Sequence, residues 1–235
     1  MNISSAFFDC SAPDLDSCPD ESLPEFAFVG RSNVGKSSLL NMLSGRKLGL
    51  ARVSPTPGFT KLINFFTINN TWRLVDLPGY GFAQVARKDS SQFNQAVNHY
   101  LLNRTNLCCV FALIDSGLKP QEIDVEFVEW LAHNSVPFVL VFTKTDKVLA
   151  DAVQTNIAAF TGRIAKWFEQ LPAVYSCSAI TGQGRSELLG VVDEAMAAIQ
   201  VAAAAEAANR PEGAPSARSK AKKPRKHRPD LNRPW

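Results

Sequence analysis

The sequence lacks the cysteine and histidine patterns that build disulfide frameworks and transition-metal sites. It has five cysteines, an odd number, and no C-x-x-C pair, which argues against a disulfide framework and against a zinc site. The three histidines, His99, His133 and His227, share no ligand spacing. We therefore expect reduced cysteines, buried as small apolar residues where they fall in strands, and no protein-bound transition metal.

Long apolar runs and a secretory signal are also lacking. The longest apolar run, around Cys108 to Ile114, has the length of a strand and falls far short of the roughly 20 residues that a membrane helix needs. Near the N-terminus the apolar pair Phe7-Phe8 is followed by acidic residues, whereas a signal peptide has a basic region before a long apolar one. The sequence therefore predicts a cytoplasmic protein without a membrane segment, and we expect a monomer.

The formal net charge of +3 is unevenly distributed along the chain. Residues 206–235 carry nine Lys or Arg against three acidic residues, so the rest of the chain holds sixteen basic and nineteen acidic side chains. This segment has only two large apolar residues, Leu231 and Trp235, and its composition predicts a disordered basic tail. Such a tail suits the phosphates of a nucleic acid, and a solvated tail that serves solubility is the alternative.

Strand-like and helical patterns alternate from Phe26 onward, which is typical of βαβ units in an α/β fold. We expect an N-terminal extension over 1–23, one domain over 24–205 and the tail over 206–235. Strands are predicted at 26–29, 62–68, 71–75, 108–114, 138–142 and 173–177, and helices at 36–43, 90–103, 121–134, 151–169 and 186–205. Asn69-Asn70 joins the second and third strands as a turn, which predicts a hairpin in a mixed six-stranded sheet with helices on both faces.

A phosphate-binding loop lies between the first predicted strand and the first predicted helix. Its sequence, GRSNVGKS, fits G-x-x-x-x-G-K-[ST] and consists of Gly30, Arg31, Ser32, Asn33, Val34, Gly35, Lys36 and Ser37. Backbone N–H groups of such a loop, at a helix N-terminus, favour polyphosphate. We expect Lys36 at the outer phosphates and the Ser37 hydroxyl on Mg²⁺.

Two further segments are placed to contact the third phosphate. Thr60, in the turn-rich stretch Thr56-Pro57-Gly58-Phe59-Thr60, is a candidate ligand of Mg²⁺ and of the γ-phosphate. Asp76-Leu77-Pro78-Gly79 follows a strand directly, so Asp76 is expected to hold Mg²⁺ through a water molecule and the Gly79 N–H to donate to the γ-phosphate. Hydrolysis would break that hydrogen bond and release the loop.

The identity of the nucleotide base is indicated by the segment Thr143-Lys144-Thr145-Asp146, which again lies at a strand end. A carboxylate accepts two parallel hydrogen bonds from N1–H and the 2-amino group of guanine, whereas adenine has an acceptor at N1 and lacks the 2-amino donor. Backbone N–H groups of the segment Ser176-Cys177-Ser178-Ala179 are expected to meet guanine O6. Since these segments come in order at strand ends, the sequence predicts GTP binding.

Four segments, GRSNVGKSSLLN, TPGFTKLINFF, DLPGYGFA and TKTDK, resemble those of the EngB (YsxC/YihA) family of bacterial ribosome-biogenesis GTP-binding proteins. The resemblance implies a Ras-like P-loop GTPase domain that binds GTP and Mg²⁺. Its implied GTP contacts, besides those of the phosphate loop, are Gly58, Phe59, Thr60, Lys61, Leu62, Asp76, Leu77, Pro78, Gly79, Thr143, Lys144, Thr145, Asp146, Cys177, Ser178 and Ala179. Its implied Mg²⁺ ligands are Ser37 and Thr60.

The same resemblance implies a role in assembling the large ribosomal subunit and a link to division septation. The partner that it implies for the basic tail is ribosomal RNA. Lys36, Thr60 and Gly79 are then the candidate catalytic residues. Ras-like enzymes carry a water-orienting glutamine where this chain has Tyr80, so we expect slow GTP hydrolysis that the ribosomal precursor or K⁺ on Asn33 stimulates. The alternative for Asn33 is that it only stabilises the turn of the phosphate loop. The alternative is a nucleotide-sensing RNA- or ribosome-binding module in which hydrolysis is incidental. A tRNA-modification GTPase is less well supported, because it would need a further catalytic domain.

Overall fold

The computed structural model describes residues 1–45, 62–80 and 87–208, without the side chains of 87–94 and 206–208. In this part of the chain one mixed sheet has seven strands in the order β1-β3-β4-β2-β5-β6-β7. They are β1 (Ala6–Ala12), β2 (Glu25–Gly30), β3 (Ile63–Ile68), β4 (Trp72–Asp76), β5 (Leu107–Asp115), β6 (Phe138–Thr143) and β7 (Val174–Ser176). Only β3 runs against the others. The expected hairpin of β3 and β4 is present, and Asn69 and Asn70 turn with φ of 49° and 56°.

The prediction of six strands is wrong by one, because β1 adds to the free edge of β3. Its sequence, AFFDCSA, lacks a clean alternation, and its pairing depends on contacts distant in sequence. Asn69 supplies one of them, since its Oδ1 accepts hydrogen bonds from the Ser4 N–H at 2.8 Å and the Ser5 N–H at 3.1 Å. The β3–β4 turn therefore fixes the chain just before β1.

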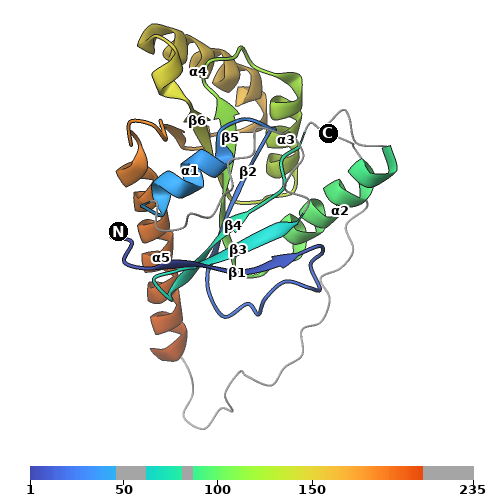
Figure 1. The fold of residues 1–235 in the computed structure, drawn as a ribbon, viewed down its shortest axis with the longest axis vertical. Coiled ribbons are helices and arrows are strands. Elements are labelled where there is room, and N and C mark those ends of the chain that lie inside the picture. Colours follow the sequence, from blue (N-terminus) through green and yellow to red (C-terminus); the bar gives the residue numbers. More distant parts are fainter. Residues whose placement is uncertain (46–61, 81–86, 209–235) are drawn as a thin grey trace.

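Helices cover both faces of the sheet, as expected (Figure 1). They are α1 (Lys36–Leu43), α2 (Arg87–Asn103), α3 (Glu122–His133), α4 (Ala150–Ile164) and α5 (Arg185–Ala208), with 3₁₀ turns at Thr145–Lys147 and Ala165–Trp167. Neighbouring residues of β2 point to opposite faces. Ala27 and Val29 pack with α2, α3 and α4, whereas Phe26 and Phe28 pack with α1 and α5. The two apolar layers hold β2 at the centre of the sheet and fix the loop that follows it.

The last helix, α5, is the one described helix that is long and apolar enough to cross a membrane by length and composition. In this fold the first half of α5 is part of the core. Its residues Leu188, Leu189 and Val192 are buried against the sheet face that also carries α1. Further along, Ile199 and Val201 are exposed. The apolar character of the first half is thus explained by packing.

A buried group of charges lies at the opposite end of β2 from the phosphate loop. The Glu25 carboxylate is fully buried and accepts hydrogen bonds from Arg104 Nε and Nη2, at 2.8 and 2.6 Å, and from the Tyr100 hydroxyl at 2.8 Å. Arg104 also donates to the Pro19 carbonyl at 2.6 Å. Since these partners come from β2, α2 and the N-terminal segment, the group ties that segment to the sheet.

Candidate nucleotide-binding site

The predicted site segments meet at the end of the sheet where the parallel strands have their C-terminal ends. The described loops after β2, β4, β5, β6 and β7 lie there, in the place where open α/β sheets bind ligands. Four of these loops carry residues that the sequence singled out. The structure therefore brings the phosphate loop, Asp76, Asp146 and Ala179 to one rim.

The phosphate loop turns through two left-handed residues, Asn33 with φ of 65° and Gly35 with φ of 101°. Gly30 is required by packing, because a Cβ there would lie 2.8 Å from the Cβ and the carbonyl oxygen of Leu113. The turn leads into α1, whose first N–H groups have no acceptor within the helix and favour an anion. This conformation is suited to holding phosphates.

At the phosphate end, Lys36 and Asp76 form an ion pair between Nζ and Oδ1. A Cβ on Gly79 would lie 2.9 Å from the Gly30 carbonyl oxygen, so only glycine fits that close to the phosphate loop. The Ser32 N–H donates to the Tyr80 carbonyl at 3.4 Å. Ser37 and Asp76 offer oxygen donors alone, the type that Mg²⁺ prefers. The residues present therefore fit a magnesium ion beside the outer phosphates.

Part of the predicted contact set cannot be placed. Gly58, Phe59, Thr60 and Lys61 lie outside the described residues, and with them the second predicted Mg²⁺ ligand. Leu62, the last of that group, lies just before β3. Leu77 is buried and its N–H donates to the Phe28 carbonyl at 3.0 Å, so it ties the loop after β4 to β2.

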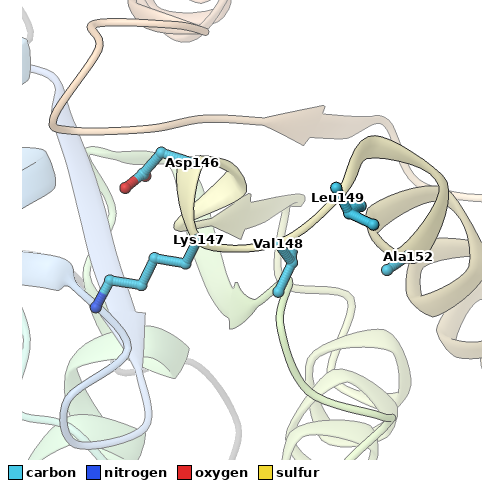
Figure 2. A pocket seen from close by; sticks show the side chains of 5 residues that line it. All are labelled: Asp146, Lys147, Val148, Leu149 and Ala152. Atoms are coloured by element: carbon cyan, nitrogen blue, oxygen red, sulfur yellow. The ribbon is translucent and has the colours of Figure 1, made fainter.

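At the base end, Asp146 stands in a 3₁₀ turn directly after β6. Its Oδ1 accepts a hydrogen bond of 2.6 Å from the hydroxyl of Ser178, a fully buried residue of the last loop. Figure 2 shows the side chains of Asp146 and Lys147 extending to the same side of this turn, in an open pocket of ≈ 510 Å³ that Val148, Leu149 and Ala152 also line. The exposed carboxylate is therefore accessible to a purine edge.

The base end is joined to the phosphate end by two residues of the same segment, Thr143 and Lys144. The Thr143 hydroxyl donates to the Val34 carbonyl at 2.6 Å, and Lys144 Nζ donates to the Asn33 carbonyl at 2.6 Å. Lys144 takes a left-handed conformation, with φ of 62°. Direct hydrogen bonds thus fix the segment that carries Asp146 against the phosphate loop.

Of the last three residues of Ser176-Cys177-Ser178-Ala179, the segment expected near guanine O6, one has a backbone donor without an acceptor in the described chain. The Cys177 N–H donates to the Phe142 carbonyl at 2.8 Å and the Ser178 N–H to the Gln183 carbonyl at 3.1 Å. Within the described chain, the Ala179 N–H has no such acceptor and remains available for a ligand. Burial raises the pKa of the Cys177 thiol to about 12, so this cysteine is a packing residue rather than a nucleophile.

Sequence reasoning missed a polar network beside the phosphate loop. The Asp124 carboxylate, in the first turn of α3, accepts hydrogen bonds from Arg31 Nε at 3.0 Å and from the Tyr80 hydroxyl at 3.0 Å. Burial raises the pKa of Asp124, and burial with the nearby Asp124 charge raises that of Tyr80. Tyr80 thus points into the protein, where its ring packs on Phe127 with centroids 4.6 Å apart. An acidic residue in a helix's first turn was the only sequence signal.

The fold, the phosphate loop and the carboxylate at the base end together define a P-loop GTPase. The sequence model of a family described as 50S ribosome-binding GTPase matches residues 25–144. A probable GTP-binding protein EngB of Bacteroides fragilis is 48% identical over 193 residues, which are 82% of this chain and 96% of that protein. The chain belongs to the EngB family of GTP-binding proteins.

Solved structures give the same result. The crystal structure of a probable GTP-binding protein engB matches with a TM-score of 0.58 and 25% identity, over 73% of this chain and 98% of that one. The structure of Era in complex with MgGDPNP and nucleotides 1506–1542 of 16S ribosomal RNA matches with a TM-score of 0.52 and 25% identity, over 72% of this chain and 55% of that one. The Ras-like GTPase fold predicted from the sequence is confirmed.

Proposed function

We propose that this chain is a cytoplasmic, monomeric, GTP-dependent switch in the assembly of the large ribosomal subunit, with the link to division septation that its family resemblance implies. The observation that carries the nucleotide part is the placement of Asp146 and Lys36 at two ends of one rim, joined through Lys144 and Asn33. The ribosomal part is supported by the description of the matching family as a 50S ribosome-binding GTPase.

In the proposed reaction, Lys36 and the phosphate-loop N–H groups bind the β- and γ-phosphates. Ser37, Thr60 and, through water, Asp76 would hold Mg²⁺. When bound, Mg²⁺ supplies charge neutralisation at the phosphates. The Gly79 N–H donates to the γ-phosphate, so loss of that phosphate frees the loop after β4. Asp146 selects guanine, and the Ala179 N–H donates to O6.

Hydrolysis by the isolated chain is expected to be slow, at about 10⁻⁴ to 10⁻³ s⁻¹. The side chain at the position of the water-orienting glutamine is Tyr80, whose hydroxyl donates to Asp124 and whose ring is buried. It therefore cannot orient a water molecule at the γ-phosphate. We propose that K⁺ bound near Asn33, or the ribosomal precursor, supplies the missing stimulation. Equal GTPase rates in K⁺ and Na⁺, with and without large subunits, would contradict this.

A nucleotide-sensing module with incidental hydrolysis is the second candidate function. It differs from the switch in what happens after binding, because only the switch needs hydrolysis for release. A Ser37→Ala variant, weakened in Mg²⁺ binding, separates the two. Normal binding to the precursor with blocked release favours the switch, whereas normal release favours the module.

The basic tail offers a separate test of RNA binding. Each phosphate that the tail neutralises adds about −0.7 to −0.9 to the slope of log K against log salt, so five or six contacts make binding steeply salt-dependent. A chain that lacks residues 206–235 should bind large subunits with a flatter salt dependence and bind GTP as before. Identical salt curves for the two chains would show that the tail serves another purpose, such as solubility.

The deciding experiment is sedimentation with ribosomal subunits under GTP, GDP and a non-hydrolysable GTP analogue. We expect co-sedimentation with the large subunit under GTP and the analogue, and release under GDP. Binding to the small subunit alone, or binding that ignores the nucleotide, would overturn the proposal.

A further inference from the structure

We propose that Asp115, at the end of β5, is a positioning residue of the guanine site. Its carboxylate holds the Lys144 ammonium in the place from which the lysine joins the base-reading loop to the phosphate loop. The sequence analysis did not single out Asp115, since it belongs to none of the nucleotide motifs. The proposal rests on the guanine site described above.

The two carboxylate oxygens of Asp115 have separate, fixed partners. Oδ1 accepts a hydrogen bond of 3.0 Å from the Gly117 N–H, and Oδ2 lies 2.6 Å from Lys144 Nζ. The side chains of Asp115 and Lys144 are only 16% and 23% exposed, so water screens this ion pair less than a surface pair. The bond to Gly117 orients the carboxylate toward Lys144.

Lys144 needs a charged partner because its side chain bridges the loop after β6 and the phosphate loop. Its Nζ also donates to the Asn33 carbonyl at 2.6 Å, and its Cε lies 3.6 Å from the point that a Cβ of Gly35 would occupy. The lysine stem therefore runs across the phosphate loop to reach its carbonyl. A lysine side chain loses about 1.5 to 2 kcal/mol of rotamer entropy when it is fixed. The neutral Asn33 carbonyl attracts the ammonium less strongly than a carboxylate does.

The loop that carries Asp115 is itself braced. The Ser116 N–H donates to the Thr143 carbonyl at 3.0 Å, and Asn156 Nδ2 of α4 donates to the Ser116 carbonyl at 2.9 Å. In the sheet, Asp115 lies opposite Thr143, the residue before Lys144. The carboxylate is therefore held by β6 and α4 at a fixed distance from the base-reading loop.

Loss of the Asp115 charge should let Lys144 leave the phosphate loop and let a bound guanine nucleotide dissociate faster. The experiment measures release of a fluorescent GDP from the full chain, on wild type, Asp115→Asn, Lys144→Ala and the double variant. We expect Asp115→Asn to accelerate release about tenfold, and to change it by less than about twofold once Lys144 is replaced. Dissociation rates refer only to loaded molecules, so a fraction of unfolded protein does not alter them.

Two further variants complete the set. Glu122→Gln removes another carboxylate that lies 2.6 Å from a cation, Arg163, but outside the site, and its release rate should equal that of wild type. Asp115→Glu keeps the negative charge and should restore release to within about threefold of wild type. If Asp115→Asn does not fold, this variant provides the test of the proposal.

The proposal is overturned if Asp115→Asn releases GDP at the wild-type rate, if it accelerates release equally with and without Lys144, or if Asp115→Glu releases as fast as Asp115→Asn. Equal wild-type affinity for GDP and ADP, measured on the same preparation, would instead show that the guanine site itself is misassigned.

Discussion

Replacing Asp124 by alanine should destabilise the fold, because three polar contacts converge on this carboxylate. Asp124 is 1% exposed and accepts hydrogen bonds from Arg31 and from the Tyr80 hydroxyl. It joins the first turn of α3 to the phosphate loop and to the segment after β4. The substitution removes the only recorded acceptor of the Tyr80 hydroxyl within the described residues.

The expected loss follows from the exposure of the two donors. Tyr80 is 5% exposed, so water cannot replace the lost acceptor, and an unsatisfied buried group costs about 1 to 3 kcal/mol. The Arg31 side chain is 22% exposed, so water compensates in part for a charged hydrogen bond worth about 1.5 to 3 kcal/mol. Relief from burying the ionised Asp124 carboxylate opposes both. The free energy of unfolding should therefore fall by about 2 to 4 kcal/mol.

Urea unfolding without nucleotide is the suitable assay, since bound GDP would add stability by mass action. The matched control is Glu122→Ala, which removes an exposed acid of the same helical turn from Arg163 and should change stability by less than about 1 kcal/mol. Tyr80→Phe should destabilise the wild type by about 1 kcal/mol but stabilise Asp124→Ala, where it removes an orphaned hydroxyl. A loss below about 1 kcal/mol for Asp124→Ala, or the same sign for Tyr80→Phe in both backgrounds, would refute this reasoning.

Two further outcomes can be checked by the same unfolding assay. Gly30→Ala places a Cβ 2.8 Å from Leu113 and should lose about 1 to 3 kcal/mol, whereas Gly162→Ala, in open space within α4, should gain about 0.4 to 1 kcal/mol; equal effects would contradict the packing at Gly30. The pKa of Asp124 is raised from its ordinary value of 3.8 by burial, so the stability contributed by its protonated form is present below that value and lost as pH rises through the raised pKa. Asp124→Asn should lack this loss just above pH 4, and an unchanged slope of stability against pH would count against the assignment.

Features encoded in short stretches of sequence were predicted well. The strand before Gly30 and the helix that begins at Lys36 follow from apolar runs on either side of the phosphate loop. The β3–β4 turn follows from Asn69-Asn70, whose side chains tolerate positive φ. In each case the determining interactions lie within a few residues, so local pattern and local structure agree.

Features that depend on distant contacts were missed. The strand β1 pairs with residues more than fifty positions away and relies on Asn69, so AFFDCSA by itself gives no strong strand signal. Asp115 and Asp124 are ordinary acidic residues in sequence. Their significance comes from Lys144, Arg31 and Tyr80, which only the folded chain brings near. A single sequence does not show which acidic residues come to lie beside these partners in the folded chain.

Nucleotide selectivity of an Asp146→Asn variant is the most direct test of the guanine site. The carboxylate should accept two hydrogen bonds from guanine, and an amide presents a donor where one of them is lost. Calorimetry with GDP, XDP and ADP should show wild type preferring GDP and the variant shifting toward XDP. The discrimination lost should be large, since a site built around hydrogen bonds to its substrate rejects an analogue that lacks them by about 10⁴ to 10⁵. A wild type that binds ADP as tightly as GDP, or a variant that keeps its preference for GDP, would contradict this assignment.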